Sequence, residues 1–324
     1  MSLNLKNILL NSSPRGSWKR ALVFVFVFVF VSLSLSAQNL FVGTYNIRNN
    51  SDNGDVENGN GWNQRVGVIC GQINFEQPDV FGTQEVLHQQ VLDLKAGLPG
   101  YDYIGVGRDD GKEDGEYECI WYNTNRLQLL DNGNFWLNET PDRPALGWDA
   151  ACIRICTWGK FKVKGEKKGK TFFYFNLHMD HVGNVARREA AKLVMKMIPQ
   201  IAGNAPVILT GDFNVDQTDG IYQTFTGSGF LKDSYECTKQ RFAQTGTFNT
   251  FNPEMWTRSR IDHIFVSAST TVNHYAIMTN GYWTERTDEQ MEQLGKDAPR
   301  EIRFKRHQLR TASDHYPVWA KITL

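Results

Sequence analysis

The sequence predicts an α/β fold in which two sheets pack face to face and helices lie outside them. Three observations support this prediction. Short runs of β-formers recur throughout residues 40–324, only three stretches have helical periodicity, and many of the connections are short enough for hairpins. Hairpin connections imply mixed, mainly antiparallel sheets. No internal repeat or linker divides the chain, so we expect a single domain over residues 38–324.

The expected strands are short and rich in β-branched and aromatic residues. They cover residues 40–48, 79–85, 101–107, 118–123, 127–137, 152–163, 170–180, 206–212, 261–267, 272–278 and 316–323. Helical spacing of apolar residues predicts helices over residues 63–75, 86–96 and 185–201. Residues 49–61 are rich in Asn, Gly and Asp, and we expect a loop there.

The first 37 residues have the organisation of a secretory signal. They contain four basic residues, which are Lys6, Arg15, Lys19 and Arg20. An apolar run over residues 21–35 follows and ends in the small residues Ser36 and Ala37. This run is shorter than the roughly 20 residues that a transmembrane helix needs. We expect a signal peptide over residues 1–37, a secreted or periplasmic protein and no stable membrane association after cleavage; an uncleaved anchor is the alternative.

The charge distribution narrows the possible partners. The whole chain has 35 basic and 35 acidic residues, and removal of the expected signal leaves 31 basic against 35 acidic, a net charge of −4. A mildly acidic protein with 41% hydrophobic residues is neither disordered nor a basic nucleic-acid-binding module. Nucleic acid is therefore a possible but not a favoured partner, and we expect a monomer that acts on a small molecule.

The five cysteines do not predict a zinc site. They are Cys70, Cys119, Cys152, Cys156 and Cys237, and none belongs to a CxxC or Cys/His pattern. The odd number leaves at least one thiol unpaired. We expect buried free thiols, while a pairing of Cys152 with Cys156 stays open.

Six short segments combine Asn, Asp, Glu and His at the ends of expected strands. They are TYNIR (44–48), GTQEV (82–86), NLHMDH (176–181), GDFN (211–214), RIDHI (260–264) and SDHYPV (313–318). Each segment alone is typical of a turn in which Asp or Asn caps backbone groups. Together they supply oxygen ligands and a few imidazoles at one edge of a sheet, and such ligands suit Mg²⁺ or Mn²⁺.

In this order the six segments resemble the endonuclease/exonuclease/phosphatase family of metal-dependent hydrolases, over essentially all of residues 40–324. The resemblance implies a four-layer α/β sandwich, with two mainly antiparallel or mixed sheets between helical layers. It also implies Mg²⁺ or Mn²⁺ as cofactor, and hydrolysis of a phosphate mono- or diester by a metal-activated water.

The resemblance implies a role for each polar residue of the six segments. Glu85 is the expected metal ligand, with Asn46 and Asp314 beside it. The expected catalytic residues are His178, Asp212, Asn214, Asp262 and His315. Asp212 would orient or deprotonate the attacking water, Asn214 would bind a phosphoryl oxygen, and Asp262 would fix the tautomer of His315. His178 would contact the phosphate, with Asp109 as its acidic partner.

Further residues are expected to bind the substrate. They are Asn46, Asn176, Arg108, Arg154 and His181. The expected substrate is a small phosphorylated metabolite, which means a sugar, a polyol or a nucleotide. The alternatives are a secreted nuclease, a phosphodiesterase of phospholipid headgroups, and a non-catalytic binding protein with the same fold.

Overall fold

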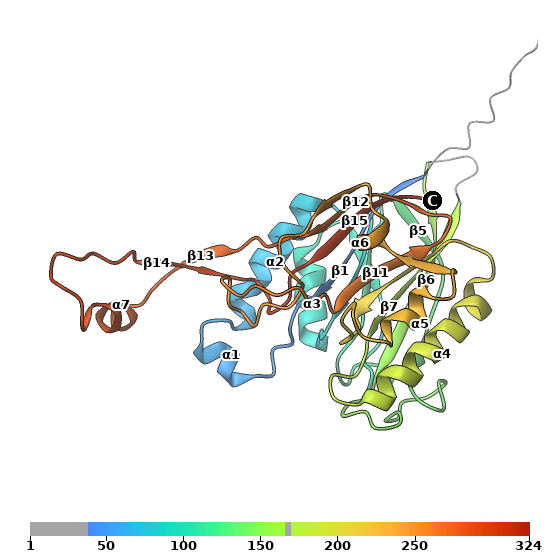
Figure 1. Ribbon diagram of the computed structural model, residues 1–324, viewed down its shortest axis with the longest axis horizontal. Helices are drawn as coiled ribbons and strands as arrows, with labels where there is room; N and C mark the ends of the chain where they lie inside the picture. The colour runs from blue at the N-terminus through green and yellow to red at the C-terminus, as the bar shows by residue number, and fades with distance from the viewer. Residues whose placement is uncertain (1–37, 166–169) are drawn as a thin grey trace, which may run out of the picture. The chain divides into compact units, whose positions relative to one another are not determined.

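Two mixed sheets form the centre of the protein in this computed structural model, which describes residues 38–165 and 170–324 (Figure 1). The expected signal peptide, residues 1–37, lies outside the described residues. The first sheet contains, in spatial order, β10 (Gln240–Phe242), β12 (Thr271–Ile277), β15 (Val318–Thr323), β1 (Asn39–Asn46), β2 (Val80–Gln84), β4 (Ile120–Asn123) and β3 (Tyr101–Ile104). Its pairs β1–β2 and β10–β12 are parallel and the others are antiparallel.

The second sheet has six strands and one parallel pair, β7–β8. Its spatial order is β5 (Leu127–Trp136), β6 (Ile155–Val163), β7 (Thr171–His178), β8 (Val207–Asp212), β11 (Asp262–Ser267) and β9 (Leu231–Asp233). A separate hairpin pairs β13 (Tyr282–Glu285) with β14 (His307–Arg310) and carries α7 (Asp288–Gly295) between them, away from the two large sheets (Figure 1).

Helices cover the outer face of each large sheet. On the first sheet, α2 (Trp62–Glu76) and α3 (His88–Gly97) pack on outward-facing side chains of β1, β2 and β4. On the second sheet, α4 (Asn184–Ala202) and α5 (Tyr222–Thr226) pack on β7, β8 and β11. A third apolar cluster fills the space between the two sheets. These layers confirm the predicted α/β sandwich.

The longer elements lie within a few residues of their predicted positions, but several short ones differ. The expected loop at 49–61 contains α1 (Asn53–Glu57). The sequence did not reveal β9, β10, β13, β14 or the helices α5, α6 (Ser234–Cys237) and α7. The strands β9 and β10 have only three residues each, too few to show a period of two. In the β13–β14 hairpin, the paired Trp283 and Leu309 are 62% and 40% exposed, so the usual apolar face is missing.

All five cysteines are free thiols. Three of them are buried, whereas Cys152 and Cys237 are half-buried. The possible pairing of Cys152 with Cys156 is thus not present.

Side-chain alternation in the central strands decides which residues point between the sheets. In β1, Leu40 and Val42 lie in the inter-sheet cluster, whereas Tyr45 lies under the helices. The other central strands alternate in the same way, with Ile208 of β8 and Ile264 of β11 facing inward. Polar residues at the inward positions near the strand ends therefore meet in the gap between the sheets.

Candidate active site

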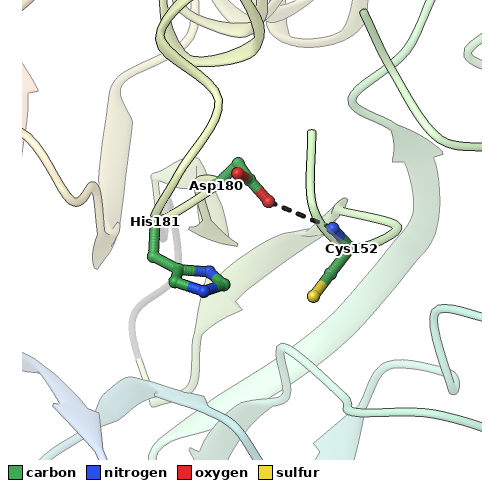
Figure 2. Close-up of side chains that lie close together, drawn as sticks. All are labelled: Cys152, Asp180 and His181. Carbon is green, nitrogen blue, oxygen red and sulfur yellow. Dashed lines mark hydrogen bonds between the residues drawn. The ribbon is translucent and has the colours of Figure 1, made fainter. Parts of the chain in front are cut away.

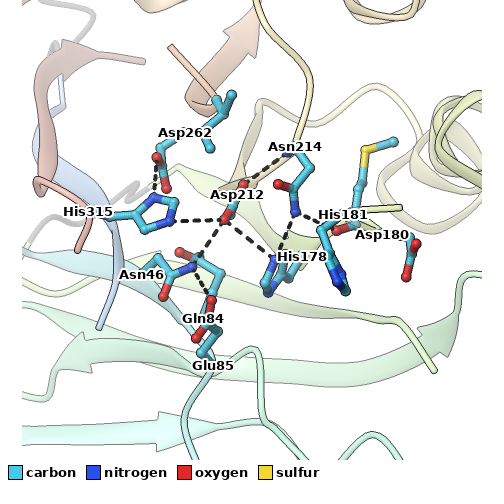
Figure 3. Close-up of polar contacts among 12 residues, drawn as sticks. Asn46, Gln84, Glu85, His178, Asp180, His181, Asp212, Asn214, Asp262 and His315 are labelled. Carbon is cyan, nitrogen blue, oxygen red and sulfur yellow. Dashed lines mark hydrogen bonds and ion pairs between the residues drawn. The ribbon is translucent and has the colours of Figure 1, made fainter. Parts of the chain in front are cut away.

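The site lies where the inward-facing positions of both sheets reach the ends of their strands (Figure 3). Asn46 has the same parity in β1 as Val42, and Asp212 has the same parity in β8 as Ile208. Asp262 has the parity of Ile264 in β11. Alternation thus turns the polar side chains toward each other across the gap.

Three residues next to these strand ends have left-handed backbone conformations. The φ angles are +59° at Arg48, +63° at Glu85 and +48° at Asn214. A residue with a side chain adopts this region at a cost on the order of 1–3 kcal/mol, and such residues concentrate at functional sites. All three side chains line the same cavity, whose volume is about 340 Å³.

Carboxylates occupy one side of this cavity. The Oε1 atom of Glu85 accepts a hydrogen bond from Nδ2 of Asn46 at 2.8 Å, and the same nitrogen lies 3.1 Å from Oδ2 of Asp212. Asp314 is also buried, and Nη1 of Arg48 lies 3.8 Å from its Oδ2. Burial and the charge of Glu85 raise the pKa of Asp314, although the positive charge of His315 opposes this.

This donor set fits a hard divalent cation. Glu85 and Asp212 can bring carboxylate oxygens within 4.8 Å of each other, beside the ring of His315, and Asp314 faces Glu85 closely enough to be repelled by it. A divalent cation would relieve that repulsion between carboxylates. Asn46 differs from its expected role, because its donor nitrogen faces both carboxylates and its Oδ1 accepts from the backbone N–H of Arg48 at 3.0 Å. Asn46 holds the carboxylates together here and can bind a metal only after its amide rotates.

Asp212 stands between two histidines (Figure 3). Its Oδ2 lies 3.4 Å from Nε2 of His178 and 3.6 Å from Nε2 of His315. Burial, together with the charge of Asp262, raises the pKa of Asp212 above the ordinary range of a carboxyl group. A carboxylate with a raised pKa is a stronger base, as the deprotonation of a water molecule requires.

The two histidines have opposite charge states. Burial alone would lower the pKa of His315, but the charges of Asp262 and Asp212 outweigh it and raise the pKa well above 6.5. Nδ1 of His315 lies 2.8 Å from Oδ2 of Asp262, so the expected pair is present. For His178, burial and the charges of Arg154 and Arg108 lower the pKa well below 6.5. His315 is therefore an imidazolium, whereas His178 is neutral.

The buried carboxyl group near Nδ1 of His178 is that of Glu118, whereas the expected partner Asp109 lies elsewhere. Nε2 of His178 accepts from Nδ2 of Asn214 at 3.1 Å, so the ring proton is on Nδ1. That Nδ1 has no hydrogen-bond partner, and neither carboxylate oxygen of the fully buried Glu118 has one. The two groups can bring ligand atoms within 4.8 Å of each other, whereas Asp109 lies outside the cavity and its side chain is 44% exposed. Glu118 shares the inward parity of Ile120 and Tyr122, a signal already visible in the predicted strand 118–123.

Asn214 orients His178. Its Nδ2 donates to His178 and to the backbone carbonyl of Met179, at 3.1 and 3.0 Å, so both amide hydrogens are engaged. The expected donation to a phosphoryl oxygen would require one of these bonds to open.

Cationic and imidazole groups form the opposite wall of the cavity. Arg108 and Arg154 are 8% and 4% exposed, and both line the cavity together with His181. Nη2 of Arg154 donates to Nδ1 of His181 at 3.0 Å, and Nη1 of Arg108 donates to Oε2 of Glu116 at 2.5 Å. Three of the five residues expected to bind substrate, Arg108, Arg154 and His181, thus lie on this wall.

Asp180 anchors the loops behind this wall (Figure 2). Its carboxylate accepts backbone hydrogen bonds from four residues, namely Ala151, Cys152, Val182 and Gly183, and one from Nε of Arg154. Burial would raise the pKa of Asp180, but the bonds from Gly183, Val182 and Ala151 outweigh it and lower the pKa to about 2. Although Cys152 and His181 lie near this carboxylate, its lone pairs are engaged and it is not a free metal ligand.

Asn176 does not line the cavity in which the sequence-based expectation placed its contact with substrate. It lies two residues before His178 in β7, which places it at an inward position between the sheets, and it is fully buried. Its Nδ2 donates to the backbone carbonyls of Thr83 and Cys119 at 2.9 and 3.0 Å, and its Oδ1 accepts from Nε2 of Gln84 at 2.6 Å. Asn176 therefore joins the two sheets beneath the site.

Arg65 is a buried residue that the sequence reasoning missed. It extends from α2 to four backbone carbonyls, those of Asn60, Ile47, Arg48 and Ala312, at 2.6 to 3.2 Å. These carbonyls belong to the segments that carry Asn46 and Asp314. Arg65 thus holds both sides of the carboxylate cluster in place.

Comparison with known proteins agrees with this geometry. Residues 43–315 match the model of the Endonuclease/Exonuclease/phosphatase family. A protein of this family from Bacteroides thetaiotaomicron is 46% identical, with a TM-score of 0.81 and coverage of 89% of this chain and 98% of that chain. A mannosyl-6-phosphatase from the same species is 46% identical, with a TM-score of 0.80 and coverage of 88% and 100%.

A curated viral relative is matched over a shorter stretch. An uncharacterised protein of Acanthamoeba polyphaga mimivirus is 31% identical over 162 residues, which are 48% of this chain and 60% of that protein. The chain thus spans less than two thirds of that relative's length. From the family match, the shared fold and the assembled carboxylate and histidine residues, the chain belongs to the endonuclease/exonuclease/phosphatase family and is a hydrolase of phosphoester bonds.

Proposed function

We propose that this protein is a secreted or periplasmic phosphatase that acts as a monomer on the phosphate monoester of a small sugar. The observation that supports this proposal is the wall of Arg108, Arg154 and His181 on one side of a cavity of about 340 Å³. A monoester ends in a phosphoryl group with three terminal oxygens, which such donors can bind. A diester would need room for a second ester group on that side. The 46% identical mannosyl-6-phosphatase makes mannose 6-phosphate the first substrate to test.

We assign Mg²⁺ or Mn²⁺ to the carboxylate side of the cavity, with Glu85 and Asp314 as ligands and Asp212 next to them. When bound, such an ion neutralises charge on the phosphoryl group and lowers the pKa of a water molecule. The ligand types fit, because both ions prefer carboxylate oxygens.

The chain's own residues supply the remaining chemistry. Asp212 accepts the proton of the attacking water, for which its raised pKa is suited. His315, held as an imidazolium by Asp262, donates from Nε2 to a phosphoryl oxygen. Arg108 and Arg154 bind the terminal oxygens and hold the phosphorus in line with the water.

The alternative functions have less support. Arg108 is paired with Glu116 and Arg154 with Asp180, so these two arginines do not form an extended basic surface of the kind that long nucleic acid requires. A non-catalytic binding protein has no need of the His315–Asp262 pair, which is present.

Residues 38–165 and 170–324 contain no helix with the length and hydropathy of a membrane span.

Two assays test the proposal. The first measures phosphate release from mannose 6-phosphate, and the second measures nitrophenol release from 4-nitrophenyl phosphate and from bis(4-nitrophenyl) phosphate. We expect turnover of both monoesters, little turnover of the diester, and complete loss of activity in EDTA that Mg²⁺ or Mn²⁺ restores. Turnover of the diester alone would favour the nuclease or phospholipid alternative. No turnover of any substrate, together with a melting temperature insensitive to EDTA, would refute the metallohydrolase assignment.

A further inference from the structure

One polar residue at the edge of the cavity has no role in the chemistry described above. We propose that Asn49 is a positioning residue that holds the metal ligand Glu85 and links it to Arg108 through Glu116. This proposal rests on the metal assignment to Glu85 and is independent of the identity of the sugar.

At one end of this link, Asn49 holds the carboxylate of Glu85 by two hydrogen bonds. The backbone N–H of Asn49 lies 3.3 Å from Oε2 of Glu85, and the side-chain Nδ2 lies 3.2 Å from the same oxygen. The other oxygen, Oε1, accepts from Asn46. Both carboxylate oxygens are therefore fixed in direction, and such support typically raises metal affinity.

At the other end, the same nitrogen reaches the carboxylate that holds Arg108. Nδ2 of Asn49 donates to Oε1 of Glu116 at 3.1 Å, while Oε2 of Glu116 accepts from Nη1 of Arg108. The two amide hydrogens of Asn49 thus bridge Glu85 and Glu116, which repel each other. One amide group connects the metal side of the cavity to its cationic wall.

The orientation of this amide is determined by Ser51. Oδ1 of Asn49 accepts from the hydroxyl of Ser51 at 2.6 Å and from its backbone N–H at 3.1 Å. A half-turn of the amide would place its two hydrogens against these donors and its oxygen against two carboxylates. The assignment of nitrogen and oxygen is therefore fixed by the hydrogen-bond network.

Loss of this bridge should weaken metal binding more than it slows chemistry at saturating metal. In Asn49→Ala, Glu85 keeps its bonds from Asn46 and from the backbone N–H of residue 49, but it loses the side-chain donor that fixes Oε2 and separates it from Glu116. Asn49 itself touches neither the reacting phosphorus nor Asp212. The expected signature is a lower Mg²⁺ affinity, with kcat largely recovered at high Mg²⁺.

Calorimetric titration of Mg²⁺ into the substrate-free full chain tests whether Asn49 supports metal binding by Glu85. We expect Asn49→Ala to raise the Mg²⁺ Kd by roughly 10- to 100-fold, as is typical when a residue that supports a metal ligand is lost, with an unchanged melting temperature in EDTA. Asn50→Ala, in the neighbouring exposed residue, is the matched control and should bind Mg²⁺ like the wild type. An unchanged Kd in Asn49→Ala, a kcat that stays low at saturating Mg²⁺, or a wild-type protein that binds no Mg²⁺ would each overturn the proposal.

A second pair of variants tests the link to Glu116. Glu116→Gln and Glu116→Ala remove the same charge, but only Gln keeps an oxygen that can accept from Asn49. We expect Glu116→Ala to bind Mg²⁺ several-fold more weakly than Glu116→Gln, and both variants to bind inorganic phosphate more weakly than the wild type because Arg108 is released. Equal Mg²⁺ affinities in the two variants would overturn the link, even if sugar phosphates prove not to be substrates.

Discussion

Nδ1 of His315 lies 2.8 Å from Oδ2 of Asp262, and this contact joins the two sheets at the site. Asp262 begins β11 of the second sheet, whereas His315 precedes β15 of the first. The carboxylate sets the ring orientation, and its charge raises the pKa of the imidazole. His315 therefore keeps its proton on the side that faces Asp212.

Replacement of Asp262 by Asn should slow catalysis without unfolding the protein. The amide has the shape of the carboxylate but no charge, so His315 loses its proton more easily and its tautomer is no longer fixed. We expect kcat to fall by about 10²- to 10⁴-fold, the usual size of a general acid–base contribution. Steady-state kinetics on a phosphate monoester measures the change in kcat. A kcat equal to that of the wild type would mean that another group orients His315.

Replacement of Glu85 by Ala should abolish metal-dependent activity while the fold is retained. Glu85 is the carboxylate that both Asn46 and Asn49 hold in place, and the methyl group of Ala has no oxygen that could bind a metal there. Mg²⁺ titration and phosphate release are the measurements. Glu289→Ala, in the exposed helix α7, is the control and should behave as the wild type; full activity in Glu85→Ala would remove Glu85 from the ligand set.

Glu118 should make the stability of the protein depend on pH. Burial raises the pKa of this carboxyl group from its ordinary value of 4.5 to about 8. Between these values the folded state binds more protons than the unfolded state, so the free energy of unfolding falls as the pH rises through this window, by at most about 1.4 kcal/mol per pH unit for one group.

Glu118→Gln removes this titration. We expect the variant and the wild type to have similar stability near pH 4.5, and the variant to become the more stable of the two as the pH approaches 8. Urea unfolding at a series of pH values measures the difference, which must grow with pH. A difference independent of pH would show that Glu118 keeps its charge in the folded protein, paired with His178 or with the arginines.

Replacement of Arg65 by Met should destabilise the protein strongly. The side chain is fully buried and satisfies four backbone carbonyls, each of which would lose a charged donor. A buried polar group left without a partner costs about 1–3 kcal/mol. Urea unfolding should show a loss of several kcal/mol, and a change below about 1 kcal/mol would mean that water replaces the guanidinium.

Replacement of Asn176 by Ala should lower stability and leave KM unchanged in the fraction that folds. The carbonyls of Thr83 and Cys119 would lose the hydrogen bonds from Asn176, and Nε2 of Gln84 would lose one of its two acceptors. Thermal unfolding and steady-state kinetics separate the two effects. A stable variant with a raised KM would restore the substrate-binding role that the sequence suggested.

The sequence predicted the strands and most of the site because both follow from side-chain alternation. Asp212 ends β8, Asp262 begins β11 and Glu85 follows β2, and the inward positions of these strands are mainly apolar, so the edge at which the three residues meet could be foreseen. The depth of each side chain along its strand could not be predicted from the sequence. Asn176 has the correct parity but lies one inward position too deep, between the sheets. The inward parity of Glu118 was visible in its strand, but parity alone does not show that this carboxyl group is buried near His178.

The direction of amide groups is a second kind of information that the sequence lacks. Asn46 and Asn214 are in the cavity region as expected, yet their donors are committed to neighbouring protein groups. The role of an Asn depends on which end faces inward, and that depends on contacts from the other sheet. Such contacts arise only when the two sheets pack together.

The missing side chain of Gly82 in the first sheet leaves space for the amide group of Asn176 from the second sheet. A Cβ atom there would lie 2.2 Å from Oδ1 of Asn176, so even Ala at this position would displace the Asn176 amide or the sheet that carries it. Because one sheet carries Glu85 and Asp314 and the other carries Asp212 and Asp262, neither sheet holds a working site by itself. Enzymatic activity thus reports on the docking of the two sheets, and a variant that widens the gap between them should lose turnover while its circular dichroism spectrum still looks native.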